Sequence, residues 1–292
     1  MAAYEEKRFR SRDGLSLYFR DYAARDPAGS RGLPVLCLHG LTRNCRDFES
    51  LAMHLAARRR VITPDQRGRG GSQYDATWTN YHPGVYVDDM WTLLRELSLE
   101  RVIIVGTSMG GLMAMLMAAT RPQSVAAIVL NDVGPQIDPA GAARIQSYVG
   151  RLPPVRSWND AAAQMKATFG TALPDYSEQQ WQQFARLSFV EGEDGVPRLA
   201  ADPKIGDAVR TLPVPPGATA AMWLAFGALK EIPMLALRGE HSDILSPDTF
   251  DRMQREVPAL TRVTVPNRGH PPQLDEPQSV AAIDRFIDAV AG

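Results

Sequence analysis

Short apolar runs that alternate with helix-length segments constrain the fold of this chain more than any other feature. The runs span residues 35–38, 61–63, 102–105, 126–130, 234–237 and 263–265. None alternates apolar with polar residues, as expected of parallel strands that are buried on both faces. Apolar residues at helical spacing occupy residues 48–58, 86–97, 111–119, 247–256 and 279–289. This alternation of strands and helices predicts an α/β protein built on a mostly parallel sheet.

The start of the chain predicts an antiparallel hairpin. Residues 7–11 and 15–21 flank Asp13-Gly14, a pair typical of tight turns between strands. The two hairpin strands and the six apolar runs together predict an eight-stranded sheet flanked by helices.

The regular pattern breaks between about residues 133 and 228. This segment holds helix-like pieces and several prolines, and it contains no convincing strand of the sheet. A connection this long normally has structure of its own and often forms a lid. We therefore expect a core of residues 1–133 and 229–292, with a mainly helical cap of residues 134–228 inserted after the sixth strand.

Aromatic side chains are frequent in the predicted cap. A single aromatic residue there more often packs the cap against the core than contacts a ligand. Taken together, however, some of them are expected to line an apolar pocket. The five that we select are Trp158, Phe169, Trp181, Phe184 and Trp223.

Composition argues against several kinds of partner. Lys and Arg (32 residues) nearly balance Asp and Glu (33 residues), so the chain offers no field of one sign to attract nucleic acid or an anionic membrane. The N-terminus lacks the apolar stretch of a signal peptide, and no later run approaches the roughly 18 residues of a membrane span. With only Cys37 and Cys45, neither a disulfide nor a metal site is expected. These features predict a cytoplasmic protein that binds neither nucleic acid nor membrane.

The run Gly106-Thr107-Ser108-Met109-Gly110-Gly111 is the strongest chemical signal in the sequence. It follows the strand predicted at residues 102–105 and leads into a helix. A serine exposed on such a tight turn needs Gly two positions before and after it, because side chains there would clash. The helix that follows points its N-terminal amides and positive dipole end at negative charge that forms beside Ser108. Ser108 is therefore predicted to be a catalytic nucleophile.

Four segments in the same order resemble the α/β-hydrolase fold family, and the resemblance extends over nearly the whole chain, weakest in the predicted cap. They are Leu38-His39-Gly40-Leu41, residues 65–72 (DQRGRGGS), the Ser108 turn, and a late Asp followed by His. The resemblance implies the eight-stranded sheet of that family and the chain order Ser, acid, His for a catalytic triad.

Residues 65–72 are rich in Gly and Arg, which suits phosphate, but no P-loop Gly-Lys-Ser/Thr follows. We assign this run no ligand and expect a structural turn.

His270 is the predicted general base. A serine hydroxyl is a poor nucleophile, so it needs a base within hydrogen-bond reach and a third group that holds the tautomer of that base. His270 lies in the loop after the last predicted strand, a position that resembles that of the family's catalytic histidine. The other histidines have different contexts: His39 lies in the His-Gly turn, His54 in a helix, His82 at a tip and His241 beside the expected acid.

Two aspartates that follow strands compete for the role of the acid. Asp243 precedes His270 by 27 positions, enough for one helix and one strand, and its loop resembles the commonest location of the acid in the family. Some relatives carry the acid after the sixth strand, where Asp132 stands; otherwise Asp132 is a hinge or cap residue at the start of the insertion. Glu240 is a third possibility, but its side chain leaves the strand end too early. We expect Asp243 to be the acid and keep Asp132 as the alternative.

Two backbone amides are expected to bind the oxyanion of a tetrahedral intermediate. One is that of Met109, directly after the nucleophile. Resemblance to the family implies that Leu41 supplies the second. His39 is expected to brace this loop rather than to react.

These residues predict acyl transfer through an acyl-enzyme on Ser108, with no metal and no organic cofactor. The aspartate nucleophile of related dehalogenases and epoxide hydrolases is replaced by Ser108, which excludes their chemistry. The expected substrate is a small to medium, largely apolar carboxylic ester or lactone. Three alternatives stay open: carbon–carbon bond hydrolysis of ring-fission diketones, perhydrolase or haloperoxidase-like chemistry, and a non-enzymatic small-molecule receptor on the same fold.

Overall fold

An eight-stranded sheet lies at the centre of the computed structural model, which describes residues 3–26, 32–212 and 215–291. The strands are β1 (Glu5–Arg10), β2 (Ser16–Tyr22), β3 (Val35–Leu38), β4 (Val61–Pro64), β5 (Val102–Thr107), β6 (Val125–Asn131), β9 (Met234–Gly239) and β10 (Thr261–Val265). Their order across the sheet is β1-β2-β4-β3-β5-β6-β9-β10. Strand β2 runs antiparallel to both of its neighbours, and all pairs from β4 to β10 are parallel. The prediction of a mostly parallel eight-stranded sheet is confirmed.

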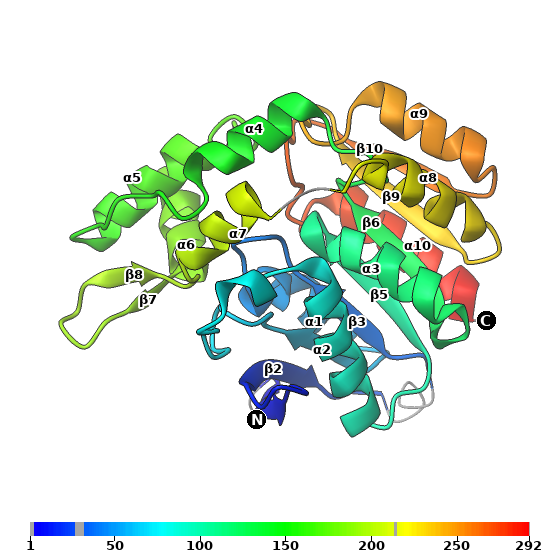
Figure 1. The fold of residues 1–292 in the computed structure, drawn as a ribbon, viewed down its shortest axis with the longest axis horizontal. Helices are drawn as coiled ribbons and strands as arrows, with labels where there is room; N and C mark the ends of the chain where they lie inside the picture. The colour runs from blue at the N-terminus through cyan, green and yellow to red at the C-terminus, as the bar shows by residue number, and fades with distance from the viewer. Residues whose placement is uncertain (1–2, 27–31, 213–214, 292) are drawn as a thin grey trace.

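Helices cover both faces of this sheet (Figure 1). They are α1 (Glu49–Leu55), α2 (Pro83–Glu96), α3 (Met109–Thr120), α8 (Ala218–Ala228), α9 (Pro247–Glu256) and α10 (Pro277–Ala291), with short 3-10 helices at Cys45–Phe48, Trp78–Asn80 and Pro122–Ser124. Side chains of a strand point alternately to the two faces. On β5, Ile104 belongs to the hydrophobic cluster that contains side chains of α2, α3, α8 and α9, whereas Ile103 and Val105 belong to the cluster that contains side chains of α1 and α10. Since both faces of the central strands are buried, their sequences show no polar alternation.

The chain leaves the sheet after β6 and returns at β9, and much of the segment between them projects beyond one end of the core (Figure 1). It contains α4 (Pro139–Tyr148), α5 (Trp158–Phe169), α6 (Glu178–Ser188), α7 (Lys204–Thr211) and a hairpin of β7 (Phe189–Glu191) and β8 (Pro197–Leu199). Phe169, Trp181 and Phe184 belong to a separate hydrophobic cluster within this segment. The predicted helical insertion after the sixth strand is confirmed. The sequence patterns above do not predict its hairpin, although Asp194-Gly195 supplies the turn signal for it.

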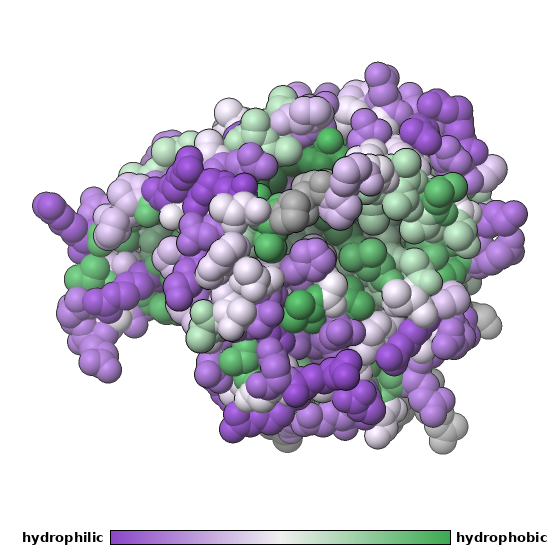
Figure 2. All heavy atoms as spheres, in the orientation of Figure 1, coloured by the Kyte–Doolittle hydropathy of each residue, from purple (hydrophilic) through white to green (hydrophobic). Residues whose placement is uncertain are grey.

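Helix α8 lies within the predicted cap by sequence but packs with the core. Trp223 and Phe226 share a hydrophobic cluster with the buried side chains of α3, which α8 contacts directly. The opposite side of α8 faces solvent: Leu224 is 77% exposed, and hydrophobic residues gather over α8 in Figure 2. The projecting part of the insertion therefore ends before α8.

The division into a core (residues 1–133 and 229–292) and a cap (residues 134–228) stays a prediction. Its outermost residues, 1 and 292, lie outside the described part of the chain. Within the described ranges, no helix combines the length and the apolar character that crossing a bilayer requires.

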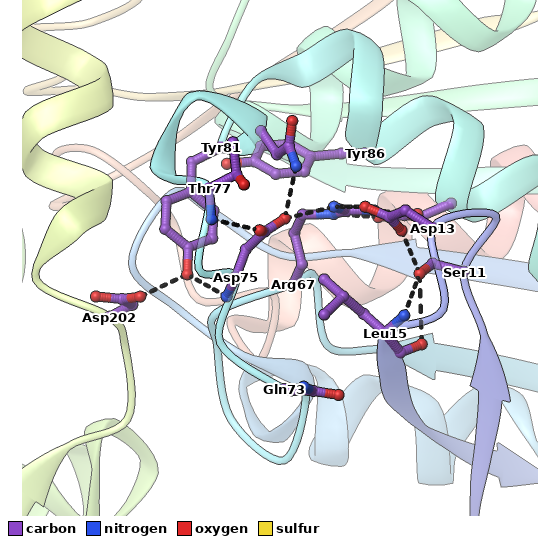
Figure 3. A network of polar contacts seen from close by, with 12 residues as sticks. Ser11, Asp13, Leu15, Arg67, Gln73, Asp75, Thr77, Tyr81, Tyr86 and Asp202 are labelled. Atoms are coloured by element: carbon purple, nitrogen blue, oxygen red, sulfur yellow. Dashed lines mark hydrogen bonds and ion pairs between the residues drawn. The ribbon is translucent and has the colours of Figure 1, made fainter.

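The loop after β4, residues 65–72, is fixed by a buried arginine (Figure 3). The Arg67 guanidinium donates to the carboxylates of Asp13, Asp75 and Asp89 over distances of 2.7 to 3.1 Å. The bonds from Arg67 lower the pKa of Asp13 to about 2. Because Asp13 lies in the β1–β2 turn and Asp89 on α2, Arg67 connects three separate segments of the core.

Candidate active site

Ser108 lies at the sharp turn between the end of β5 and the start of α3. Its backbone has φ 52° and ψ −115°, a conformation that costs a non-glycine residue roughly 1–3 kcal/mol. Hydrogen bonds hold it there: the Ser108 N–H donates to the Asn131 carbonyl over 3.0 Å, and the Ser108 carbonyl accepts from Gly111 and Leu112. The surrounding structure thus keeps the Ser108 side chain on a strained turn at the carboxyl edge of the sheet.

The glycines of this turn are required by close backbone approaches. A Cβ atom on Gly106 would lie 2.4 Å from the Gly110 carbonyl oxygen, and one on Gly110 would lie 2.0 Å from the Leu38 carbonyl oxygen. Real Cβ atoms essentially never approach so closely. The steric reason inferred from the sequence for Gly two positions before and after Ser108 is therefore present in the structure.

His270 connects Ser108 to a buried carboxylate. Its Nε2 lies 2.8 Å from Ser108 Oγ, and its Nδ1 lies 2.8 Å from Asp132 Oδ2. A carboxylate oxygen only accepts hydrogen bonds, so the hydrogen-bond pattern places a proton on Nδ1 and leaves Nε2 to accept the Ser108 hydroxyl proton. Three residues that are distant in sequence form one continuous hydrogen-bonded line.

Asp132 is held rigidly at the end of β6. Its side chain is fully buried, and its backbone has φ 57°. Besides His270, its carboxylate accepts from the Gly239 N–H over 2.8 Å and from the Ser242 hydroxyl over 2.6 Å. A buried carboxylate needs such donors to offset lost hydration, and here they also fix the direction in which it faces His270.

The structure does not bring Asp243, the expected acid, into a hydrogen bond with His270; Asp132 holds that place. The Asp243 carboxylate bonds instead to the Arg144 guanidinium on α4, over 2.5 and 2.8 Å. After β9 the chain turns so that the Ser242 hydroxyl, not the Asp243 side chain, meets Asp132. Burial by itself raises the pKa of Asp243, but the bonds and charge of Arg144 hold it below its usual value. Spacing along the chain allowed either aspartate, and in this structure Asp132 is the one hydrogen-bonded to His270.

The amides of Leu41 and Met109 are both unengaged. In the described residues, neither N–H donates to a protein acceptor. The Gly40 carbonyl lies 2.7 Å from His39 Nδ1 and accepts from the Arg43 N–H over 3.2 Å. Because the carbonyl and N–H of a trans peptide point in opposite directions, these contacts turn the Leu41 N–H the other way. Leu41 lines the same pocket as Ser108, and Met109 directly follows Ser108 at the start of α3.

His39 is part of the scaffold of this loop. Burial lowers its pKa to about 3, so the ring is neutral at physiological pH. Its Nε2 accepts from the Gln66 N–H over 3.0 Å, which leaves Nδ1 to donate to the Gly40 carbonyl. This arrangement agrees with the expected bracing role and leaves His39 no contact with Ser108 in the described hydrogen bonds.

The pocket at Ser108 has an apolar wall from the insertion. Of the five aromatic residues selected from the sequence, Phe169 and Phe184 line it. Ile145 and Tyr148 of α4 line it too. They were not among the five, although their spacing of three positions marks one face of a helix.

The other three selected aromatic residues lie elsewhere. Trp181 is 2% exposed and fills the hydrophobic cluster of the insertion. The Trp158 ring lies under the Arg186 guanidinium at 3.5 Å, and the Trp223 ring under that of Arg252 at 3.9 Å. These three side chains pack the molecule and do not line the pocket.

A wider groove continues from this pocket between α1 and α6. It shares Asp47, Phe184 and Gln273 with the pocket and extends past Met53 and Gln180. Its lining mixes amide, charged and apolar side chains.

A model of the alpha/beta hydrolase fold family matches residues 34–277. The chain belongs to this family. The matched segment contains Ser108, Asp132 and His270 and runs from the start of β3 to the start of α10.

Several α/β hydrolases are similar over nearly the whole chain. A 3-hydroxybutyrate-oligomer hydrolase of Cupriavidus necator is 36% identical over 270 residues, which cover 90% of each chain. An sn-1-specific diacylglycerol lipase of Mus musculus is 30% identical over 274 residues, 90% of this chain and 81% of the lipase. The crystal structure of an alpha/beta hydrolase from Novosphingobium aromaticivorans matches with a TM-score of 0.91 and 43% identity over 99% of both chains. The protein is a hydrolase of the α/β-hydrolase fold.

Proposed function

We propose that this α/β hydrolase cleaves carboxylic esters through an acyl-enzyme on Ser108, with His270 as the base and Asp132 as the acid that orients it. The observation that carries the proposal is the hydrogen-bonded line at 2.8 Å from Ser108 Oγ to His270 Nε2 and at 2.8 Å from His270 Nδ1 to Asp132 Oδ2. A nucleophile, a base and a group that fixes the tautomer of that base are the elements that acyl transfer needs.

The first half of the reaction forms the acyl-enzyme. As Ser108 Oγ attacks the ester carbonyl carbon, its proton passes to His270 Nε2, and the carbonyl oxygen becomes an oxyanion that accepts from the Leu41 and Met109 amides. Asp132 stabilises the resulting imidazolium through its bond to Nδ1. The imidazolium then gives its proton to the alcohol oxygen as the carbon–oxygen bond breaks, and the alcohol departs.

The second half releases the acid. Water attacks the acyl carbon while His270 accepts one of its protons, and a second oxyanion forms at the same two amides. Collapse of this intermediate breaks the bond to Ser108 Oγ, which takes the proton back from His270. The products are one carboxylic acid and one alcohol, and the enzyme returns to its starting state.

The substrate class that we favour is an elongated ester of short hydroxy acids. The apolar wall of Ile145, Tyr148, Phe169 and Phe184 suits a short acyl group beside Ser108, and the adjoining groove gives room for a further polar chain. In support, the relative from Cupriavidus necator, which is similar over 90% of the chain, acts on 3-hydroxybutyrate oligomers.

Active-site labelling and a substrate panel test the proposal. A fluorophosphonate probe is expected to label the wild-type protein and not Ser108→Ala, because the probe reacts with an activated serine. Among p-nitrophenyl esters, 3-hydroxybutyrate dimers and trimers, lactones and a ring-fission diketone, the highest kcat/KM is expected with the hydroxybutyrate oligomers. Absence of labelling in folded wild-type protein contradicts the serine mechanism. A preference for the lactone or the diketone overturns the substrate class alone.

A further inference from the structure

Arg69 is a buried cation that lacks an ion-pair partner in the described part of the chain. Its side chain is 0% exposed, yet within residues 3–26, 32–212 and 215–291 no carboxylate forms an ion pair with it. Its guanidinium, a permanent cation in proteins, donates only to neutral groups. Burying a charge without a counter-ion is costly, so such a residue calls for an explanation beyond packing.

Arg67, two positions earlier, provides the contrast. It is 1% exposed and is surrounded by the carboxylates of Asp13, Asp75 and Asp89. These three carboxylates carry more negative charge than Arg67 alone neutralises, but none of them forms an ion pair with Arg69. The two arginines share one loop and differ in their direct partners.

The contacts of Arg69 lead to both expected oxyanion donors. Its Nε donates to the Leu41 carbonyl over 2.9 Å, and its Nη2 lies 3.8 Å from Met109 Sδ. Leu41 lies in the loop after β3 and Met109 begins α3, so one guanidinium bridges the two segments that flank Ser108. Arg69 holds the Leu41–Thr42 peptide through the Leu41 carbonyl. His39 holds the Gly40–Leu41 peptide, which contains the Leu41 N–H, through the Gly40 carbonyl.

Arg69 is itself held in place from several sides. Its Nη1 donates to the Arg67 carbonyl over 2.7 Å and to the Tyr86 hydroxyl over 2.9 Å. The guanidinium lies 5.5 Å from the ring centre of Tyr81 and 4.8 Å from that of Tyr86. Tyr81 in turn bonds to Asp202 of the insertion, as Figure 3 shows. A side chain fixed this firmly can hold other groups in position.

We propose that Arg69 is a positioning residue of the oxyanion hole, which holds the Leu41 loop against the start of α3 and places a positive charge without an ion-pair partner in the described residues behind the two amides. This inference rests on the proposed ester hydrolysis at Ser108. Preorganised donors and fixed charges favour a transition state when they face charge that develops during the reaction. The negative charge of the oxyanion is attracted to the Arg69 cation, so Arg69 stabilises the tetrahedral state more than the bound ester.

The test compares substrate turnover with binding of a tetrahedral analogue. Arg69→Met removes the charge and keeps an unbranched side chain. Arg69→Lys keeps the charge but loses the planar guanidinium with its several N–H donors. For a p-nitrophenyl ester, kcat of Arg69→Met is expected to fall on the order of 100-fold, as for loss of an oxyanion donor, with KM changed less than about threefold. The inhibition constant of phenylboronic acid, which forms a tetrahedral adduct with serine, is expected to rise by a similar factor. For Arg69→Lys, kcat is expected to fall about tenfold and the inhibition constant of phenylboronic acid to rise about tenfold.

Arg262→Met is the matched control, since it makes the same substitution at a partly buried arginine that bonds to Phe250 and Asp251 of α9 and contacts neither Leu41 nor Met109. Its kcat and boronic acid affinity are expected to stay within about threefold of wild type, even where its melting temperature falls. The positioning role is overturned if folded Arg69→Met keeps the wild-type kcat and boronic acid affinity. If Arg69→Met does not fold, the same result in folded Arg69→Lys overturns it. Wild-type protein that fails to react with fluorophosphonate overturns the proposed function instead, which separates the two failures.

Discussion

The loop after β6 and the loop after β9 each present an aspartate at the same edge of the sheet, but the two carboxylates have different surroundings. Asp132 is fully buried and accepts three hydrogen bonds, including the one from His270. The Asp243 side chain is 36% exposed and forms an ion pair with Arg144 of α4. Strands β6 and β9 are direct neighbours, so the difference arises from the turns and not from the sheet. One loop places a carboxylate inside the hydrogen-bonded line of the site, and the other fastens the insertion to the core.

The largest expected effect comes from Asp132→Asn. The substitution keeps the shape of the side chain but offers an N–H where Nδ1 of His270 needs an acceptor, which favours the wrong tautomer. We expect kcat/KM to fall by about 10³- to 10⁴-fold, the size of effect seen when the acid of a Ser-His-Asp triad becomes an amide. Ester hydrolysis at pH 7 measures it, and circular dichroism checks the fold. Near-normal activity would remove Asp132 from the mechanism and reverse the comparison.

Ser242→Ala tests how much the surroundings of Asp132 contribute. The Ser242 hydroxyl donates to Asp132 Oδ2 over 2.6 Å, and its loss leaves that oxygen with His270 alone. One hydrogen bond to a charged group is worth about 1.5 kcal/mol, so kcat/KM is expected to fall about tenfold. Ser246→Ala is the control, because Ser246 caps α9 without touching Asp132; it should lower stability and leave kcat/KM unchanged. Equal activity losses in the two variants would show that the effect is structural only.

Most of the fold was predictable because buried parallel strands and amphipathic helices have strong local patterns. The positions of β3, β5 and β9 agree closely with their apolar runs, and the Ser108 turn follows from its glycines. Hairpin β7–β8 has strands of three residues, too short for a reliable alternation pattern, so only Asp194-Gly195 marks it.

Which aspartate contacts His270 was not predictable from local sequence. The direction of Asp132 depends on its positive φ and on donors from Gly239 and Ser242, which lie more than a hundred positions away. The pocket lining has the same origin: Trp181 and Phe184 share one face of α6, and only the packing of α6 decides which of them reaches the pocket. Long-range contacts, and not residue types, determine which aspartate contacts His270 and which aromatic side chain lines the pocket.

Asp243→Asn is expected to leave catalysis nearly intact. Its carboxylate contacts Arg144 and makes no hydrogen bond to His270 in the described residues, so kcat/KM should stay within about threefold of wild type. The ion pair is partly exposed, and its loss is expected to lower the free energy of unfolding by less than about 1 kcal/mol. Chemical denaturation and ester hydrolysis measure the two quantities. A loss as large as that of Asp132→Asn would mean that both aspartates act on His270.

The smallest expected effect is the pH dependence of the Arg144–Asp243 pair. Burial alone raises the pKa of Asp243, but Arg144 lowers it below the ordinary value of 3.8 in the folded protein. A group whose folded pKa is depressed contributes stability above its unfolded pKa and loses it as the pH falls through the folded pKa. The coupling free energy from a double-mutant cycle of Asp243→Asn and Arg144→Gln should therefore be below about 1 kcal/mol at pH 7 and decrease as the pH falls below 3.8 and through the folded pKa of Asp243. The cycle cancels the contributions of other acids whose pKa is also lowered, such as Asp13. A coupling that stays unchanged or grows as the pH falls would show that the attachment of α4 to the β9 loop does not depend on the Asp243 charge.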